Sequence, residues 1–215
     1  MVAYPPPPWK VNIPDTLFQT LSLVDTDRIR PFVPPQFEMI SNLPGKCAAG
    51  IYLARYGPGS TSEYNELGVF LSFVRFSGKT GIYVSNMYVD SEDSLTLGCD
   101  VLGLPKEMAS FRYEHGRRGR ITVLQGDREI YSISYGKRFY LWRQSAGGYA
   151  FGTQGPDVIR FRGSWKIRIG MTRARISIPE KSPLSRYGLN RPWATFCGKE
   201  GSGTLGADIE VIKGK

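Results

Sequence analysis

Lys106 is the residue in this chain that is best placed to do chemistry. It directly follows a proline in the segment Gly103-Leu104-Pro105-Lys106, in apolar surroundings and just past the expected end of a helix. A lysine that is desolvated in a pocket loses its proton more easily and becomes an amine nucleophile. The sequence therefore predicts a nucleophilic role for Lys106, and the alternative is an ordinary solvated lysine at a strand end.

Other catalytic and metal-binding arrangements have little support. His115 is the only histidine, which argues against a histidine-based triad and against a site with several histidine ligands. The three cysteines are widely spaced and form no C-x-x-C pair, so they indicate neither a disulfide framework nor a zinc site. Glu92 and Asp93 are explained as first-turn acids of a helix rather than as metal ligands. We predict no metal, flavin or nicotinamide cofactor.

We expect a reduced, cytoplasmic protein, because the cysteines suggest no disulfide framework and the N-terminus suggests no secretory signal. The formal net charge is +9, but the basic residues between 160 and 175 mostly alternate with apolar ones, as on the solvated face of a strand. A solvated basic face is therefore favoured over nucleic-acid binding, which would need a contiguous positive groove with aromatic residues. No apolar run approaches the roughly 20 residues that span a bilayer, so no membrane span is expected. The N-terminus resembles no secretory signal.

The elements that must position Lys106 are mostly strands. Ser91, followed by two acids, is a good start for a helix that runs to Leu102 and ends at Gly103. Apart from a short helical turn over 25–30 and a short helix over 184–187, the remaining elements are predicted as strands. Alternating apolar residues place them over 17–24, 47–56, 67–76, 82–89, 109–113, 120–125, 129–135, 139–142, 165–169, 173–178 and 207–212. We expect an α+β, mainly β fold with one main helix, in a single domain over 1–215 with an extended, proline-rich lead-in over 1–9. Trp142, Trp165 and Trp193 are expected to line a cavity or fill the core.

Several motifs appear in an order that resembles the acetoacetate decarboxylase superfamily. They are Trp9-Lys10, Val33-Pro34-Pro35, the Tyr64-Asn65-Glu66 loop, Met87-Tyr88-Val89-Asp90, Gly98 and Leu104-Pro105-Lys106. The resemblance implies a curved antiparallel sheet or β-barrel, with Lys106 forming a Schiff base with a ketone or keto acid. It implies Glu66 as the second catalytic residue. We further predict Tyr64, Tyr88 and Glu107 as substrate-binding residues. Acetoacetate decarboxylase is itself the standard example of an activated lysine, so this activation is implied by the resemblance.

Departures from the family pattern bear on the substrate. Glu107 stands where the decarboxylase has a second lysine, Asn12 and Asp15 lie where a substrate-binding arginine is expected, and the position of a further glutamate falls near Ile51. These changes favour an aldolase, dehydratase or cyclase type of lyase reaction over decarboxylation of acetoacetate.

The alternative function is a non-catalytic protein that binds an apolar, isoprenoid- or carotenoid-like molecule or assists a partner enzyme. The chain is also similar to plant relatives linked to xanthophyll metabolism, which lack the lysine. The expected partners are a small carbonyl or apolar molecule and, because relatives are often oligomeric, further copies of the chain.

Overall fold

Strands dominate the computed structural model, which describes residues 5–116 and 118–214. The helical elements are α1 (Thr26–Ile29), η1 (Arg30–Phe32), α2 (Glu92–Leu102) and η2 (Ser185–Tyr187). The strands are β1 (Trp9–Ile13), β2 (Leu17–Asp25), β3 (Glu38–Ile40), β4 (Lys46–Tyr56), β5 (Tyr64–Phe76), β6 (Lys79–Val89), β7 (Lys106–Met108), β8 (Ser110–Glu114), β9 (Gly119–Gln125), β10 (Arg128–Gln154), β11 (Asp157–Ser177) and β12 (Ala194–Ile212). The predicted fold class, α+β and mainly β with one main helix, is confirmed.

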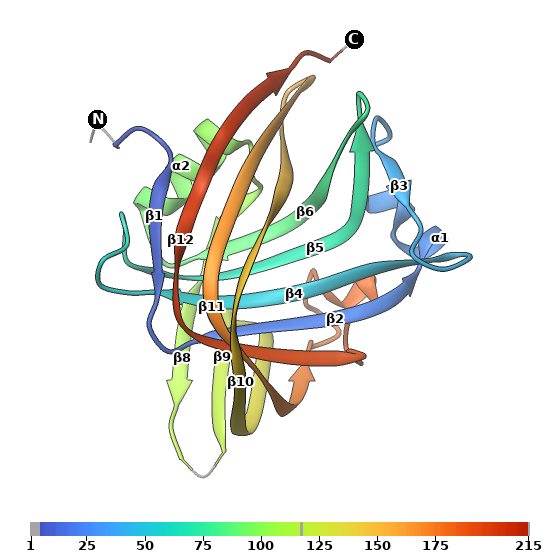
Figure 1. Ribbon diagram of the computed structural model, residues 1–215. Helices are drawn as coiled ribbons and strands as arrows, with labels where there is room; N and C mark the ends of the chain where they lie inside the picture. The colour runs from blue at the N-terminus through green and yellow to red at the C-terminus, as the bar shows by residue number, and fades with distance from the viewer. Residues whose placement is uncertain (1–4, 117, 215) are drawn as a thin grey trace.

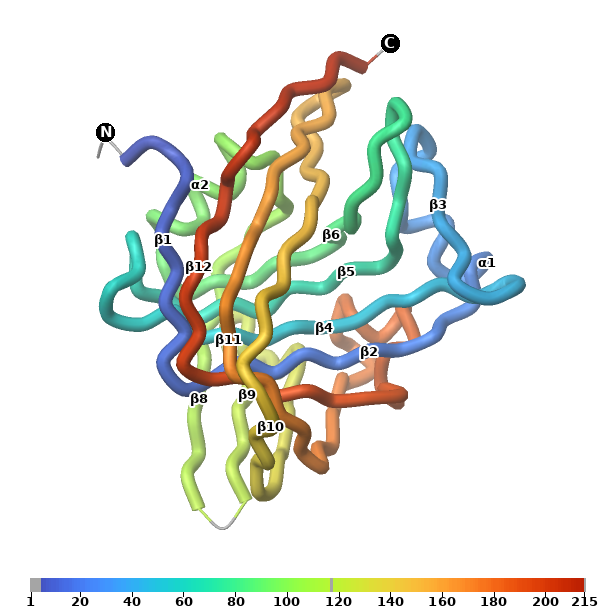
Figure 2. The backbone as a smooth tube through the Cα atoms, viewed as in Figure 1, coloured from blue at the N-terminus to red at the C-terminus, as the bar shows by residue number. Residues whose placement is uncertain are grey.

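The strands form one curved sheet that folds over on itself. Its order is β7-β6-β5-β4-β2-β12-β11-β10-β9-β8, with β1 added to β12 and β3 added to β5. In Figure 1 the upper parts of β12, β11 and β10 run across β2, β4 and β5, and Figure 2 shows the same crossing in the backbone. Side chains of β1 and β11 pack against those of β4, as Val11 and Ile167 do with Ala54. The two arms of the sheet therefore pack against each other through apolar side chains.

β12 turns the corner between the two arms. Its first part, Ala194–Gly198, pairs with β2 on one side, its later part pairs with β1 on that side, and β11 pairs with both parts on the other. The bend lies at Glu200, whose backbone has a φ of 51° in the left-handed region. One continuous strand thus belongs to both arms of the sheet.

α2 begins and ends as its sequence predicts. The hydroxyl of Ser91 accepts a hydrogen bond from the backbone N–H of Ser94, and Gly103 ends the helix in the left-handed conformation. Leu97 and Leu102 are on the buried face of the helix, whereas Val101 is exposed. With 11 residues α2 is the longest helix described, and within the described ranges no helix could cross a lipid bilayer.

Several strands are longer than their local sequence indicates. The segments 129–135 and 139–142 merge into β10, and 165–169 and 173–178 merge into β11, because the two strands pair with each other over most of their length. The Tyr64-Asn65-Glu66 segment, predicted as a loop, is the start of β5 and pairs with β4. Tertiary pairing outweighs the glycines and polar residues that suggested breaks.

Candidate active site

Lys106 lies at the start of β7, where the chain leaves α2 and adds a short parallel strand beside β6. Its side chain is only 2% exposed. It packs directly on α2 at Gly98, where an added Cβ would lie 2.4 Å from both Cδ and Cε of the lysine. Gly98 thus provides the space that lets the lysine side chain run along α2 toward Ser94.

Three groups surround the amine of Lys106. Its Nζ donates hydrogen bonds to Glu66 Oε2 at 3.1 Å and to Ser94 Oγ at 2.8 Å. It also lies 5.2 Å from the ring centre of Tyr64, within the range of a cation–π contact. Glu66 is as buried as the lysine, with its side chain 2% exposed. A buried ion pair of this kind is costly to separate, because either charge alone would be left without a partner.

Two tyrosines of β4 hold the other oxygen of Glu66. Tyr52 and Tyr56 both donate to Oε1, at 2.6 Å and 3.2 Å. The Tyr52 ring lies over Gly68 of β5, where any larger residue would collide with it. Burial, followed by the nearby charge of Glu66, raises the pKa of both tyrosines well above 10, so both keep their protons and act as donors. Glu66 therefore has one oxygen fixed by hydroxyls and one facing the amine.

The predicted site residues divide between the two faces of the sheet. Lys106, Glu66 and Tyr64 come together, whereas Tyr88 and Glu107 do not. Tyr88 is fully buried in the separate core on the opposite face, where burial raises its pKa to about 12. Glu107 is exposed and accepts a hydrogen bond from Gln125. Because neighbouring residues of a strand point to opposite faces, these two residues point away from the lysine. We therefore leave them out of the proposed site.

Tyr52, Tyr56 and Ser94 were not singled out as site residues from the sequence. Tyr52 and Tyr56 are four residues apart in a strand and so share a face of the sheet. This spacing was the signal in the sequence that could have grouped the two tyrosines. Their link to Glu66 depends on the register of β4 against β5, which pairs Ala54 with Glu66. Ser94, in the first turn of α2, carries no signal that separates it from other helical serines.

The remaining candidates lie away from the amine. Trp142 and Trp193 are exposed, so their predicted place in a cavity or the core is wrong, and His115 is exposed beside the β8–β9 hairpin turn. Cys99 is half-buried on α2, and its thiol contacts the backbone oxygen of Lys106 at 3.8 Å. Over residues 5–116 and 118–214, no three His, Cys, Asp or Glu side chains gather as metal ligands would.

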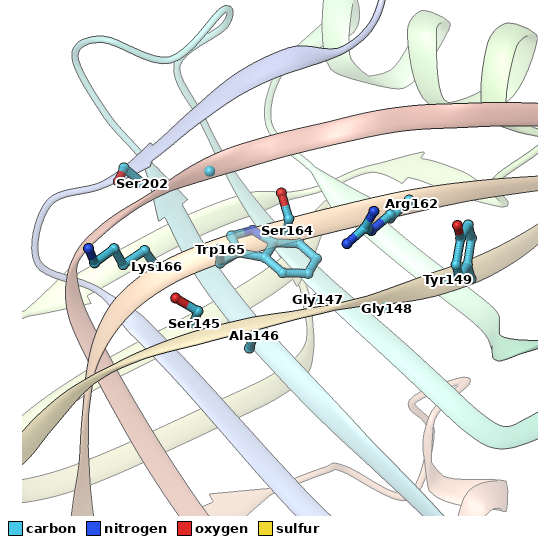
Figure 3. A pocket seen from close by; sticks show the side chains of 11 residues that line it. Ser145, Ala146, Gly147, Gly148, Tyr149, Arg162, Ser164, Trp165, Lys166 and Ser202 are labelled. Atoms are coloured by element: carbon cyan, nitrogen blue, oxygen red, sulfur yellow. The ribbon is translucent and has the colours of Figure 1, made fainter.

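A cavity of about 840 Å³ opens elsewhere, on β10, β11 and β12 (Figure 3). Polar and basic side chains line it, among them Ser145, Arg162, Ser164, Lys166 and Ser202. Lys106 and Glu66 are not among its lining residues, so this opening is separate from the amine cluster.

Relatives of known sequence cover part of this chain. A protein from Solanum lycopersicum named NEOXANTHIN-DEFICIENT 1 is 27% identical over 140 residues, which are 65% of this chain and 44% of the relative. An acetoacetate decarboxylase from Ralstonia nicotianae is 30% identical over 112 residues, 52% of this chain and 43% of the relative. The matches thus span less than half the length of either relative.

Solved structures match nearly the whole chain at low identity. The acetoacetate decarboxylase of Legionella pneumophila has a TM-score of 0.77 at 14% identity, covering 100% of this chain and 90% of that one. The enduracididine biosynthesis enzyme MppR, complexed with pyruvate, has a TM-score of 0.67 at 16% identity, covering 96% and 91%. These likenesses show the shared fold. The family model for acetoacetate decarboxylase matches residues 2–153, so the chain belongs to the acetoacetate decarboxylase family.

Proposed function

We propose that this protein is a lyase that forms a Schiff base between Lys106 and a ketone or keto-acid substrate. The observation that carries the proposal is a lysine amine withdrawn from solvent and placed 3.1 Å from a carboxylate oxygen. Membership of a family whose relatives include enzymes supports an enzymatic role.

The contact between Lys106 and Glu66 supports imine formation in which Glu66 accepts one proton and later returns it. The ammonium of Lys106 first gives a proton to Glu66 Oε2, which leaves a neutral amine and a neutral acid. The amine nitrogen attacks the substrate carbonyl carbon, and a proton moves from nitrogen to oxygen to give a carbinolamine. Glu66 then returns its proton to the hydroxyl group, which leaves as water. The product is a protonated imine, and the carboxylate is regenerated.

The protonated imine is an electron sink for a bond beside the former carbonyl carbon. Its positive charge accepts the electron pair when a neighbouring C–C bond breaks, or when a proton leaves the adjacent carbon before a hydroxyl is eliminated. Among the described residues, no arginine hydrogen-bonds or ion-pairs with Lys106 or Glu66. Asn12 and Asp15 stand where the resemblance expects a substrate-binding arginine, and this departure favours aldol, retro-aldol, dehydration or cyclisation chemistry over decarboxylation.

The test is reductive trapping of the imine with borohydride in the presence of a panel of small and bulky ketones and keto acids. Peptide mass spectrometry locates the adduct, and we expect it on Lys106 and absent from Lys106→Ala. Lys10→Ala, which removes an exposed lysine, is the control and should trap like the wild type. A folded protein that traps no carbonyl compound at Lys106 would refute the proposal.

One observation favours a second function, the binding of an apolar molecule without catalysis. An apolar cluster that includes Trp9, Met87, Leu104 and Phe161 packs against Tyr52 and Tyr64 of the site. Lys106 already has hydrogen-bond partners in Glu66 and Ser94. In that case, an apolar isoprenoid-like ligand would bind equally well to the wild type and to Lys106→Ala. Equilibrium binding by fluorescence separates this function from the lyase.

A further inference from the structure

One exposed face of β10 and β11 carries large apolar side chains. Phe139 and Trp142 of β10 are 60% and 57% exposed, and Met171 of β11 is 48% exposed. Phe139 lies directly opposite Met171, and Trp142 lies opposite Ile169, two residues before Met171. Because alternate residues of a strand share a face, the three exposed side chains lie on one face of the sheet. Leu141, where the register with β11 shifts, is 54% exposed and completes this apolar patch.

Three cations lie beside the apolar patch. Arg173 and Arg175 are exposed and follow Met171 at alternate positions of β11, so they share its face. Lys137 is also exposed, and its Nζ lies 5.5 Å from the centre of the Phe139 ring. Among the residues that the structure describes, none of these three side chains forms an ion pair or a hydrogen bond, so no described carboxylate neutralises them.

The hairpin of β10 and β11 is almost free of acidic residues. The range 130–156 contains three basic residues and the range 158–179 contains six, while neither contains an aspartate or a glutamate. A surface with such a charge attracts anions and repels a second copy of itself. The charge of this face therefore favours an anionic partner.

An anionic lipid surface fits both the charge and the apolar patch. Apolar side chains of such a face enter the headgroup layer, while lysine and arginine contact the anionic headgroups. Aromatic bases of a nucleic acid could stack on Phe139 and Trp142, but they give no comparable contact to the aliphatic Leu141 and Met171. We propose that this face docks on an anionic lipid bilayer, with the apolar patch in the headgroup layer and the three cations on the headgroups.

The docking face is on the side of the sheet that carries Lys106. From Phe139, residues directly opposite each other in neighbouring strands lead to the lysine through Met171, Phe196, Gln19, Tyr52, Gly68 and Met87. Residues that pair in this way point to the same face. An apolar carbonyl compound dissolved in the bilayer would thus meet the side of the sheet that holds the amine. This consequence rests on the proposed function, whereas lipid binding itself does not.

The test is co-sedimentation with lipid vesicles. We expect the wild-type protein to pellet with vesicles of phosphatidylcholine and phosphatidylserine, much less with phosphatidylcholine alone, and less as salt is added. Phe139→Ser tests the apolar patch, and Arg173→Gln/Arg175→Gln tests the cations. Each variant should raise the dissociation constant for the anionic vesicles by about tenfold or more.

Two matched variants control for changes that are not specific to this face. Val211→Ser removes an apolar side chain that is 53% exposed near the end of β12. Lys10→Gln/Lys166→Gln removes two exposed lysines elsewhere, and so lowers the net charge by the same amount as the arginine variant. Both controls should bind the vesicles like the wild type. Circular dichroism verifies that all variants are folded.

Several outcomes would overturn the proposal. One is a wild-type protein that does not pellet with the anionic vesicles, and another is a control that weakens binding as much as its matched variant. If the arginine variant loses binding but Phe139→Ser does not, the face is a purely electrostatic site for polyanions. Fluorescence anisotropy with a labelled single-stranded DNA would then show whether a nucleic acid is the partner. If Phe139→Ser instead changes only the sedimentation of the protein alone, a second copy covers the patch.

Discussion

Replacing Lys106 by methionine tests whether the buried ion pair is a central element of the fold. The variant keeps an unbranched apolar chain out to the Cε position, but it removes Nζ and leaves the carboxylate of Glu66 buried without its counter-charge. Both side chains are 2% exposed, so water cannot replace the lost partner. Removing one member of a buried pair costs about 3–5 kcal/mol. In a chain of 215 residues, about 2–4 °C of melting temperature corresponds to each kcal/mol, so we expect a fall of about 6–20 °C.

A second substitution should reverse much of this loss. Glu66→Gln removes the unpaired charge while its amide oxygen can still accept hydrogen bonds from Tyr52 and Tyr56. The double variant Lys106→Met/Glu66→Gln should therefore be more stable than Lys106→Met alone. The four proteins form a double-mutant cycle, which isolates the interaction between the two residues.

The control is the surface pair of Lys46 and Asp25, which is closer, at 2.6 Å, but has side chains 43% and 65% exposed. Solvent screens this pair, so Lys46→Met should change the melting temperature far less than Lys106→Met. All melting temperatures are measured by circular dichroism at neutral pH. If Lys106→Met melted at the wild-type temperature, the reasoning would be refuted, because Glu66 would then not depend on the lysine for its counter-charge.

Three further predictions concern residues around the site and on the opposite face of the sheet. Gly98→Ala puts a Cβ 2.4 Å from Lys106, so it should reduce imine trapping. In urea denaturation the free energy of unfolding should fall by about 1–3 kcal/mol, and the higher helix propensity of alanine should offset part of that fall. Tyr52→Phe, which loses a 2.6 Å hydrogen bond, should slow imine formation in stopped-flow measurements more than Tyr56→Phe, which loses one of 3.2 Å; the reverse order would contradict the site geometry. Burial raises the pKa of Tyr88 from 10 to about 12, so the unfolded chain ionises first and stability falls as the pH rises from 10 through about 12. Tyr88→Phe should flatten that part of a pH–stability curve.

Local signals predicted the part of the site that lies between α2 and β7. Ser91, the two acids that follow it, and the Gly103–Pro105 turn define the helix without reference to the rest of the chain, and Lys106 follows at once. Glu107, which we expected to bind substrate, follows Lys106 in β7 and therefore points to the opposite face of the sheet. Family resemblance added Glu66, which is 40 positions away in sequence from the lysine that it contacts.

The remaining site depends on contacts that no local pattern encodes. Tyr52 reaches Glu66 because β4 and β5 pair in one particular register, and because Gly68 leaves space for the ring. Trp142 lies in the part of β10 over 142–148 where all residues are exposed, whereas an aromatic residue in a strand is on average expected to be buried. Strand pairing over long sequence separations decided both outcomes.

The charge of the Lys106–Glu66 pair also limits which covalent products the interior can hold. A protonated imine carries the same single positive charge as the ammonium that it replaces. The carboxylate of Glu66 therefore keeps a positively charged partner both before the reaction and in the protonated imine. An acylated lysine is neutral, so it would leave the carboxylate of Glu66 without a counter-charge in a medium of low dielectric constant. Electrophiles that form imines are therefore tolerated by the folded protein, whereas acylating reagents that reach the amine should unfold it.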